Sequence, residues 1–409
     1  MAGWPDTAGP VDPALWRLLA AGSHRQAREV VATTGIRAES VGTEQREQGT
    51  AGQLLLCPFD LQVWDVDRML NFEIVNDPDY EGLELQVFDD PSHGRGMVVL
   101  LKRRRDGRFD IYRQPGLTLD PELAQVGGEL GAWVEADIDP ACFDIHEDGV
   151  DVDVRLVDLA GRVIQVRIDD RDGRRRRRGT LLAPVGSAIE RPVSLPLFIM
   201  GGCDLVRRAG RAFELRIGGR PIATGRLPAA WLHRRRLVKY TADPTVVVVN
   251  RAHDGPIAAV GFRGRSSGRV EVAPGGAGIT GLRAVGGGHA AHLALEPALP
   301  DPAGLAPGAS LAGAWRVAVD DDPAVVAGTW TAGRTGDRVD LVLDVTRGWR
   351  PKGLPPLMAA VTRAAPIFRR WPTTYRWTGT VTLGDQPALR SHWQRTGGRR
   401  DQSYRRLTT

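Results

Sequence analysis

The stretch Phe143-Asp-Ile-His-Glu-Asp-Gly-Val150, continued by Asp151-Val-Asp-Val-Arg-Leu156 and Val163-Ile-Gln-Val-Arg-Ile168, alternates apolar and polar residues. A Glu-Asp-Gly turn and Ala160-Gly161 separate the three runs. Successive side chains of a strand point to opposite faces, so this alternation is typical of strands with one buried face. Short turns between such runs indicate hairpins. The stretch therefore predicts an antiparallel meander.

The same two-residue period continues on both sides of this meander. It occurs at Gly82–Phe88 and Phe109–Tyr112 before it, and at Ala314–Val319 and Val339–Val345 after it. Many short antiparallel strands need closure or face-to-face packing to protect their edges. The sequence therefore predicts an all-β fold of two antiparallel β-barrel or β-sandwich domains.

Two kinds of segment interrupt the alternation. Leu195-Pro-Leu-Phe-Ile-Met200 is a continuous apolar run, which predicts an inner strand or a covering segment that is buried on more than one side. Pro356 to Arg369 has apolar residues at helical spacing and predicts one late helix.

The length of 409 residues favours two or three domains. Asp12 to Ala32 has near-helical apolar spacing, and a polar, turn-rich stretch follows it. We expect an N-terminal helical arm and linker over residues 1–50, a first β domain over 51–250 and a second over 251–409.

The formal charge of +5 comes from 54 basic and 49 acidic residues, and nearly all of the basic ones are arginine. One run stands out, Arg174 to Arg178. Five consecutive guanidinium groups repel one another, so part of the run should lie in water or on an anion. A solvated loop is the simpler interpretation. Nucleic acid is disfavoured as a partner, because no aromatic residues near the run could stack bases.

Metal and cofactor chemistry have no anchor in the sequence. Cys57, Cys142 and Cys203 match no zinc spacing and fit a reducing compartment. His289 and His292 would share a face only on a helix, whereas their surroundings favour a strand. With no signal peptide or membrane span expected, the sequence predicts a cytoplasmic protein without a bound metal or cofactor.

Two meanders, each interrupted by an apolar segment, together with blocks such as Tyr80–Asp90 and Gly328–Ala332, give a layout that resembles the tandem lipocalin-like proteins. That group includes carotenoid 1,2-hydratases and related cofactor-free cyclases. The resemblance covers about Leu54 to Thr409 and includes no catalytic motif. It implies a pocket within or between the barrels, a greasy or polycyclic ligand, and acid–base chemistry without a cofactor.

Polar residues at strand ends are candidates for the mouth of a barrel, where a phenol, guanidinium or amine can polarise a ligand oxygen or move a proton. The candidate catalytic residues of this kind are Tyr112, Arg113, Lys239 and Tyr240. Aromatic residues could line a cavity for a flat apolar ligand, although core packing is the more ordinary role. The candidate ligand-binding residues are Trp133, Trp330, Trp349, Tyr375, Arg376 and Trp377.

We therefore expect a protein that binds an apolar small molecule of isoprenoid, polyketide or lipid type, with cofactor-free hydration, isomerisation or cyclisation as its chemistry. The alternative is a non-catalytic binding or scaffold protein that contacts an anionic partner through the arginine run. The sequence leaves open the substrate, the reaction, the oligomeric state and whether the chain is an enzyme.

Overall fold

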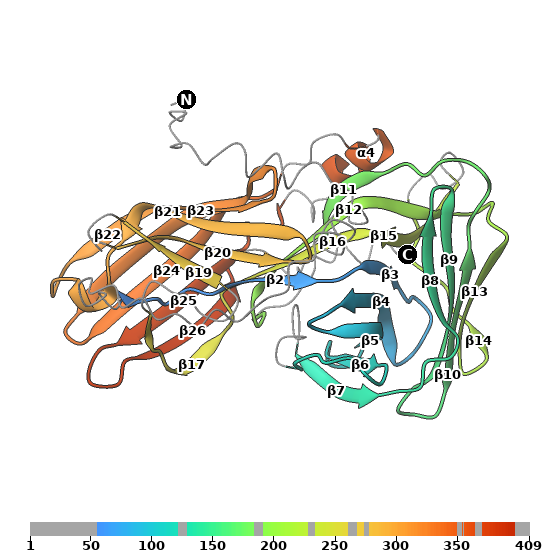
Figure 1. The fold of residues 1–409 in the computed structure, drawn as a ribbon, viewed down its shortest axis with the longest axis horizontal. Coiled ribbons are helices and arrows are strands. Elements are labelled where there is room, and N and C mark those ends of the chain that lie inside the picture. Colours follow the sequence, from blue (N-terminus) through green and yellow to red (C-terminus); the bar gives the residue numbers. More distant parts are fainter. Residues whose placement is uncertain are drawn as a thin grey trace, which may run out of the picture. The chain divides into compact units, whose positions relative to one another are not determined.

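The computed structural model (Figure 1) describes residues 55–121, 129–183, 191–227, 234–260, 268–273, 278–349, 354, 356–364 and 370–396. All of them belong to one unit of the chain, Gly52–Thr409. The predicted N-terminal arm, residues 1–50, lies outside the described residues. The division of the remainder into two domains stays a prediction.

The meander predicted between Phe143 and Ile168 is part of a five-stranded antiparallel sheet. Ile164 of this sheet lies opposite Leu156 on one side and Ile217 on the other, so the apolar positions share one face, and the predicted meander is confirmed. The strands, in spatial order, are β14 (Arg220–Pro221), β13 (Ala212–Ile217), β10 (Val163–Asp169), β9 (Gly149–Val157) and β8 (Ala141–His146).

A ten-stranded sheet curls beside it. Its strands, in spatial order, are β2 (Leu61–Asp65), β16 (Asp243–Val249), β12 (Leu195–Arg207), β15 (Arg235–Thr241), β3 (Arg68–Glu73), β4 (Tyr80–Asp90), β5 (Gly94–Arg103), β6 (Phe109–Arg113) and β7 (Leu130–Glu135), with β11 (Gly179–Ala183) paired to β12. All neighbours are antiparallel except β6 and β7, which are parallel. The predicted inner strand at Leu195–Met200 is confirmed, since β12 lies between β16 and β15 and most of that run is buried.

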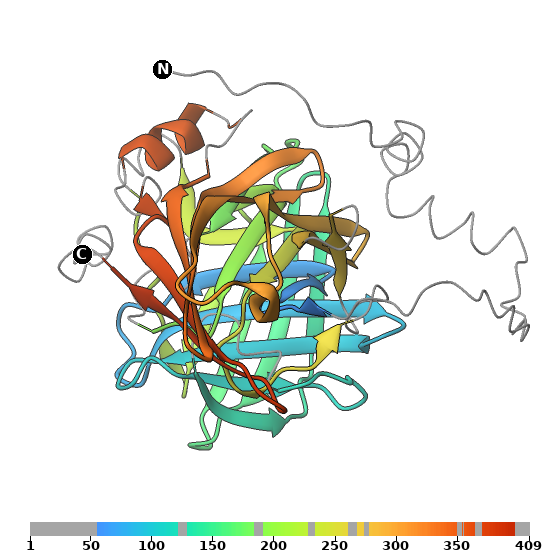
Figure 2. The same cartoon turned by 90° about the vertical axis from the view of Figure 1, so that its left-hand side faces the viewer.

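A nine-stranded antiparallel sheet follows, and Figure 2 brings it to the front. Its strands, in spatial order, are β17 (His253–Pro256), β26 (Ala388–Arg395), β25 (Tyr375–Thr382), β24 (Arg338–Arg347), β23 (Asp322–Thr335), β22 (Ser310–Val319), β21 (His289–Leu299), β20 (Ile279–Gly286) and β19 (Gly268–Val272). The short strands β1 (Leu55–Leu56) and β18 (Ala259–Val260) pair with each other. A 3-10 turn, η2, spans Pro302–Gly304, and the predicted late helix is α4, Pro356–Ala364.

Three buried clusters hold these sheets together. One lies between the five-stranded and the ten-stranded sheet and includes Val152 and Leu85. A second covers the opposite face of the ten-stranded sheet, and a third joins the nine-stranded sheet to β1, β2 and β16. The fold is therefore all-β, with curled antiparallel sheets that form a half-barrel, as the alternation predicts.

The two histidines lie on strand β21, as predicted, and each has its own acidic partners. His289 lies 2.7 Å from Asp320 and 3.2 Å from Asp243, while His292 lies 2.8 Å from Glu271. Burial lowers the pKa of His289, but the two neighbouring aspartates outweigh it and raise that pKa to about 9. Among the described residues no group of three metal-ligating side chains converges. Within the same residues, no helix has the length and apolar character needed to cross a membrane.

Candidate functional site

One row of side chains crosses seven strands of the ten-stranded sheet, from β12 to β7. Residues directly opposite one another in neighbouring strands point to the same face, so the strand registers place one residue of each strand in this row. In order across the sheet they are Leu205, Lys239, Asn71, Glu84, Leu100, Ile111 and Trp133. The row is polar in the middle and apolar at both ends.

The face that carries this row is concave. Trp64 of β2 and Val248 of β16 belong to the same buried cluster as Val98 of β5 and Ile111 of β6, although many strands separate them in the sheet. The cluster runs along this face from β2 to β6, and the sheet that carries it is curled. We call this surface the concave face, and its polar row is embedded in an apolar wall.

Glu84 is the central acid of the row. Gln86 Nε2 donates a hydrogen bond to Glu84 Oε1 at 2.6 Å, and Asn71 Nδ2 donates one to Oε2 at 3.4 Å. Burial raises the pKa of Glu84, and this effect outweighs the two hydrogen bonds and the charge of Lys239, which lower it. The carboxyl group therefore keeps its proton to a higher pH than an ordinary glutamate.

Lys239 supplies the neighbouring positive charge. It makes no ion pair within 4 Å in the part of the chain that the structure describes, and its charge reaches Glu84 and Cys203. Burial raises the pKa of Cys203 to about 12, so this thiol is neutral at physiological pH. The concave face thus combines one uncompensated amine, one protonatable carboxyl and two amides.

Three of the predicted residues lie on the concave face: Lys239, Trp133 and Arg113. Arg113 lies in the adjacent row, opposite Val98 and Glu135. It pairs with Glu135 at 2.9 Å, donates to the Leu117 carbonyl at 3.2 Å and lies 6.0 Å from the centre of the Trp133 ring. These contacts hold Arg113 at the rim, where its charge is already balanced.

Tyr112 and Tyr240 lie on the other face, in the cluster between the two sheets. The Leu159 N–H donates to Tyr112 Oη at 3.1 Å, whereas the buried Tyr240 Oη has no hydrogen-bond partner within the described chain. Burial raises the pKa of both phenols. The structure therefore separates each tyrosine from its sequence neighbour, Arg113 or Lys239, by the thickness of the sheet.

The residues predicted in the second half lie in or near the core of the nine-stranded sheet. Trp330 and Trp377 flank Leu343 in one row, and neither indole N–H has an acceptor within the described residues. Tyr375 is buried in the same cluster, while Arg376 points outward and pairs with Asp344 at 2.6 Å.

Of the second-half residues, Trp349 alone packs against the concave-face cluster, and it also touches the core of the nine-stranded sheet. Its indole donates to Asp322 Oδ2 at 3.1 Å.

Sequence reasoning missed Glu84, Asn71 and Gln86. Glu84 and Gln86 alternate with Leu83, Leu85 and Val87, which is the ordinary pattern of a strand with one face in water. Only the curl of the sheet, which brings apolar residues over both faces of β4, distinguishes them from solvent-facing polar residues. Asparagine is rare in this chain, and the position of Asn71 in a strand was an available signal.

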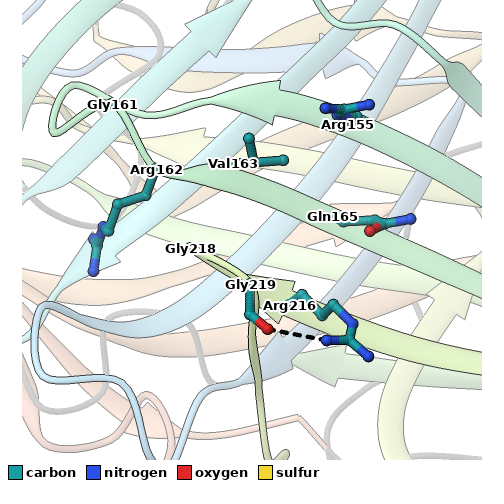
Figure 3. A pocket seen from close by; sticks show the side chains of 8 residues that line it. All are labelled: Arg155, Gly161, Arg162, Val163, Gln165, Arg216, Gly218 and Gly219. Atoms are coloured by element: carbon teal, nitrogen blue, oxygen red, sulfur yellow. Dashed lines mark hydrogen bonds between the residues drawn. The ribbon is translucent and has the colours of Figure 1, made fainter.

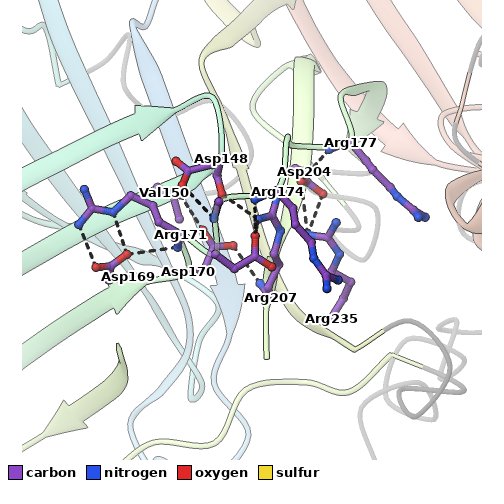
Figure 4. A network of polar contacts seen from close by, with 12 residues as sticks. Asp148, Val150, Asp169, Asp170, Arg171, Arg174, Arg177, Asp204, Arg207 and Arg235 are labelled. Atoms are coloured by element: carbon purple, nitrogen blue, oxygen red, sulfur yellow. Dashed lines mark hydrogen bonds and ion pairs between the residues drawn. The ribbon is translucent and has the colours of Figure 1, made fainter. Parts of the chain in front are cut away.

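The arginine run is anchored from within (Figure 4). The run follows a fully buried carboxylate, Asp170, which accepts from the Val150 N–H at 2.6 Å and from the Arg207 N–H at 2.9 Å, and within the run the Arg176 N–H donates to the Glu147 carbonyl at 2.9 Å. Asp204 accepts from the Arg177 N–H at 3.1 Å. Arg176 is buried, with its guanidinium 5.6 Å from the centre of the Tyr240 ring. The run is therefore a fixed segment, and its backbone has a defined course.

The other four arginines of the run are exposed. Arg175 and Arg178 share one exposed acid, Glu147, at 3.4 and 2.6 Å. The guanidinium groups of Arg174 and Arg177 have no carboxylate within 4 Å among the described residues, although their backbone N–H groups donate to Asp172 and Asp204, and Figure 4 shows the Arg177 side chain pointing away from the network. Exposed, weakly compensated guanidinium groups on a fixed segment are able to contact an anion.

Comparisons with protein-family models, with curated proteins and with solved structures found no match to this chain.

Proposed function

We propose that the concave face binds an apolar small molecule, of isoprenoid, polyketide or lipid type, and acts on it by cofactor-free acid–base chemistry. The observation that carries the proposal is Glu84, a carboxyl with a raised pKa that lies in register with Asn71 and Lys239 inside an apolar wall. A few fixed polar groups in an apolar surround are typical of small-molecule sites. The layout's resemblance to tandem lipocalin-like proteins agrees with this proposal and is itself a hypothesis.

The chemistry follows from the proton of Glu84. The protonated carboxyl donates to a carbon–carbon double bond or carbonyl oxygen of the ligand, and Asn71 and Gln86 hold the carboxyl in place meanwhile. Loss of a proton from a neighbouring ligand carbon returns it to the carboxylate, which gives an isomerisation or a cyclisation with no net change in Glu84. Lys239 favours the transient carboxylate through its positive charge.

The test has a binding arm and a turnover arm. Small molecules extracted from protein purified out of its native cells are identified by mass spectrometry, for the wild type and for Asn71→Trp, which fills the middle of the row. We expect one apolar compound, recovered about tenfold less from Asn71→Trp. Glu84→Gln should retain the compound but convert it about 10²- to 10⁴-fold more slowly, because amide hydrogens are poor acids.

The matched control is Glu81→Gln, because Glu81 lies on the same strand but pairs with Lys102 at 2.8 Å. It should leave both recovery and turnover unchanged. The wild-type rate should fall as the pH rises through the pKa of Glu84, since the protonated form is the active one. An empty spectrum from wild-type protein, or equal recovery from Asn71→Trp, would contradict the proposal.

A second candidate function rests on the exposed arginines of the run. In this case the protein is a binding or scaffold protein that contacts an anionic partner. The anchored backbone reduces the entropy that binding would cost, because the segment is already ordered.

Poly-L-glutamate is the probe for this second function. Its affinity should fall with added salt, and about tenfold when Arg174, Arg175, Arg177 and Arg178 are all replaced by alanine, since each exposed contact contributes little alone. Fluorescence anisotropy with labelled polymer gives the affinity. Replacement of the exposed Arg316, Arg338, Arg347 and Arg390 of the nine-stranded sheet by alanine is the charge-matched control. Equal losses in the two quadruple variants would mean that only the net charge matters.

A further inference from the structure

The outer face of the five-stranded sheet carries a groove with a volume of about 560 Å³ (Figure 3). Ligand sites for small molecules commonly have volumes of several hundred Å³. The groove lies where β10 begins and β13 ends, on a different sheet from the concave face. Its lining includes Arg155, Arg162, Val163, Gln165, Arg216 and the Gly218–Gly219 turn.

Three of these side chains form a row across neighbouring strands. Arg155 of β9 lies opposite Gln165 of β10, and Gln165 lies opposite Arg216 of β13. Side chains directly opposite each other have Cβ atoms about 5 Å apart. Figure 3 shows the three extending on the same side of the groove. Two guanidinium groups with an amide between them therefore present donors over one short stretch of surface.

The charges in this row are only partly compensated. Arg155 is exposed and has no carboxylate within 4 Å in the described part of the chain. Arg216 pairs with the exposed Glu214 of its own strand and donates to the Gly219 carbonyl at 3.0 Å, which orients it along the rim.

Arg162 differs from Arg155 in that its charge is balanced. It lies 2.9 Å from Asp158 and 2.7 Å from Asp79, with its guanidinium over the Tyr80 ring. Arg155 therefore carries the uncompensated charge of the groove, and Arg216 contributes the guanidinium N–H groups that Glu214 and the Gly219 carbonyl do not use.

An apolar strip borders this cationic row. Val163, in the lining, lies opposite Val157 of β9, one row away from Arg155 and Gln165. Val157, and Leu159 in the turn that follows β9, are 53% and 58% exposed, whereas most large apolar residues of this sheet are buried. Water-exposed apolar surface next to a cationic row matches a ligand with an acidic head and an apolar tail.

We propose that this groove binds a small amphipathic carboxylate, such as a medium-chain fatty acid. The carboxylate lies between Arg155 and Arg216, whose planar forks match its two oxygens, and the Gln165 amide donates to it. The alkyl chain lies over Val163 and Val157. This site is separate from the concave face and does not depend on the function proposed there.

Isothermal titration calorimetry with decanoate, hexanoate and decylamine tests the assignment. Decanoate should bind, hexanoate should bind more weakly because less apolar surface is covered, and decylamine should not bind. Arg155→Gln and Arg216→Gln should each weaken decanoate binding about fivefold. Val157→Ser should reduce the difference in affinity between decanoate and hexanoate. Decylamine should still not bind to this variant.

Two controls make the outcome specific. Arg338→Gln removes an exposed arginine on β24 and should leave decanoate affinity unchanged. Asn71→Trp, which blocks the concave face, should also leave it unchanged, so failure at one site is distinguishable from failure at the other. Decanoate binding that is insensitive to Arg155→Gln, or lost equally in Arg338→Gln or Asn71→Trp, would overturn the assignment.

Discussion

Replacing Asp170 with alanine is expected to lower the free energy of unfolding by about 3 kcal/mol. The carboxylate is fully buried and accepts from the backbone N–H groups of Val150 and Arg207, which lie in different strands. Alanine would leave both N–H groups buried without an acceptor, and each such group costs about 1–3 kcal/mol. Gly149 shows how tight this site is, because a Cβ there would clash with Asp170 Oδ1.

Urea unfolding followed by circular dichroism measures the effect. Asp144→Ala is the control, because Asp144 is 56% exposed and pairs only at the surface with Arg68. It should change stability by less than about 1 kcal/mol. Asp170→Asn should fall between the two, since the amide keeps one acceptor oxygen but directs its NH₂ group at a donor. A loss of less than about 1 kcal/mol for Asp170→Ala would show that other groups satisfy the two N–H donors.

Trp315→Ala is expected to cost about 4 kcal/mol of stability, the larger of the two effects. Trp315 is 2% exposed in the core of the nine-stranded sheet, and its indole donates to the Asp344 carbonyl at 3.1 Å. Gly328 lies opposite Trp315, and a Cβ at that glycine would come within 2.7 Å of the indole nitrogen. The surrounding sheet is closely fitted to this ring, so little collapse into the vacated volume is expected.

Trp315→Phe separates packing from hydrogen bonding, because phenylalanine fills most of the volume and lacks the N–H. It should cost about 1–2 kcal/mol, chiefly through the lost hydrogen bond to the Asp344 carbonyl and the lost volume. Leu311→Ala is the matched control on the same strand, where the side chain is 39% exposed. Chemical denaturation monitored by far-ultraviolet circular dichroism measures all three. If Trp315→Ala and Leu311→Ala were equally destabilising, the core assignment of Trp315 would be wrong.

The local pattern of the chain predicted strands well and their distant partners poorly. Val150 to Leu156 and Val163 to Ile168 form neighbouring strands as their alternation requires, because a tight turn decides their pairing. The parallel pairing of β6 with β7 and the insertion of β12 between β16 and β15 depend on contacts between residues far apart in the sequence. Alternation carries no information about such partners.

The candidate site was predicted only in part for the same reason. Lys239, Arg113 and Trp133 were chosen from their residue types, and the strand registers bring them to one face. The alternation around Glu84 is that of a solvent-facing residue, because a sequence does not show that a sheet curls over its polar side. The run Arg174–Arg178 was interpreted as a solvated loop, and this fails for Arg176, which is buried beside Tyr240.

The pairing of β2 with β16 also has a consequence for synthesis of the chain. Leu61 to Asp65 meet their partner only when Val249 has been added, roughly 180 residues later, which takes a ribosome about 10–40 s. During that interval strand β2 has not yet paired with β16, whereas the hairpins that follow β2 in the sequence close within microseconds to milliseconds. The nascent polypeptide therefore exposes an unpaired apolar strand for a prolonged period, and slow elongation before Val249 would extend that period.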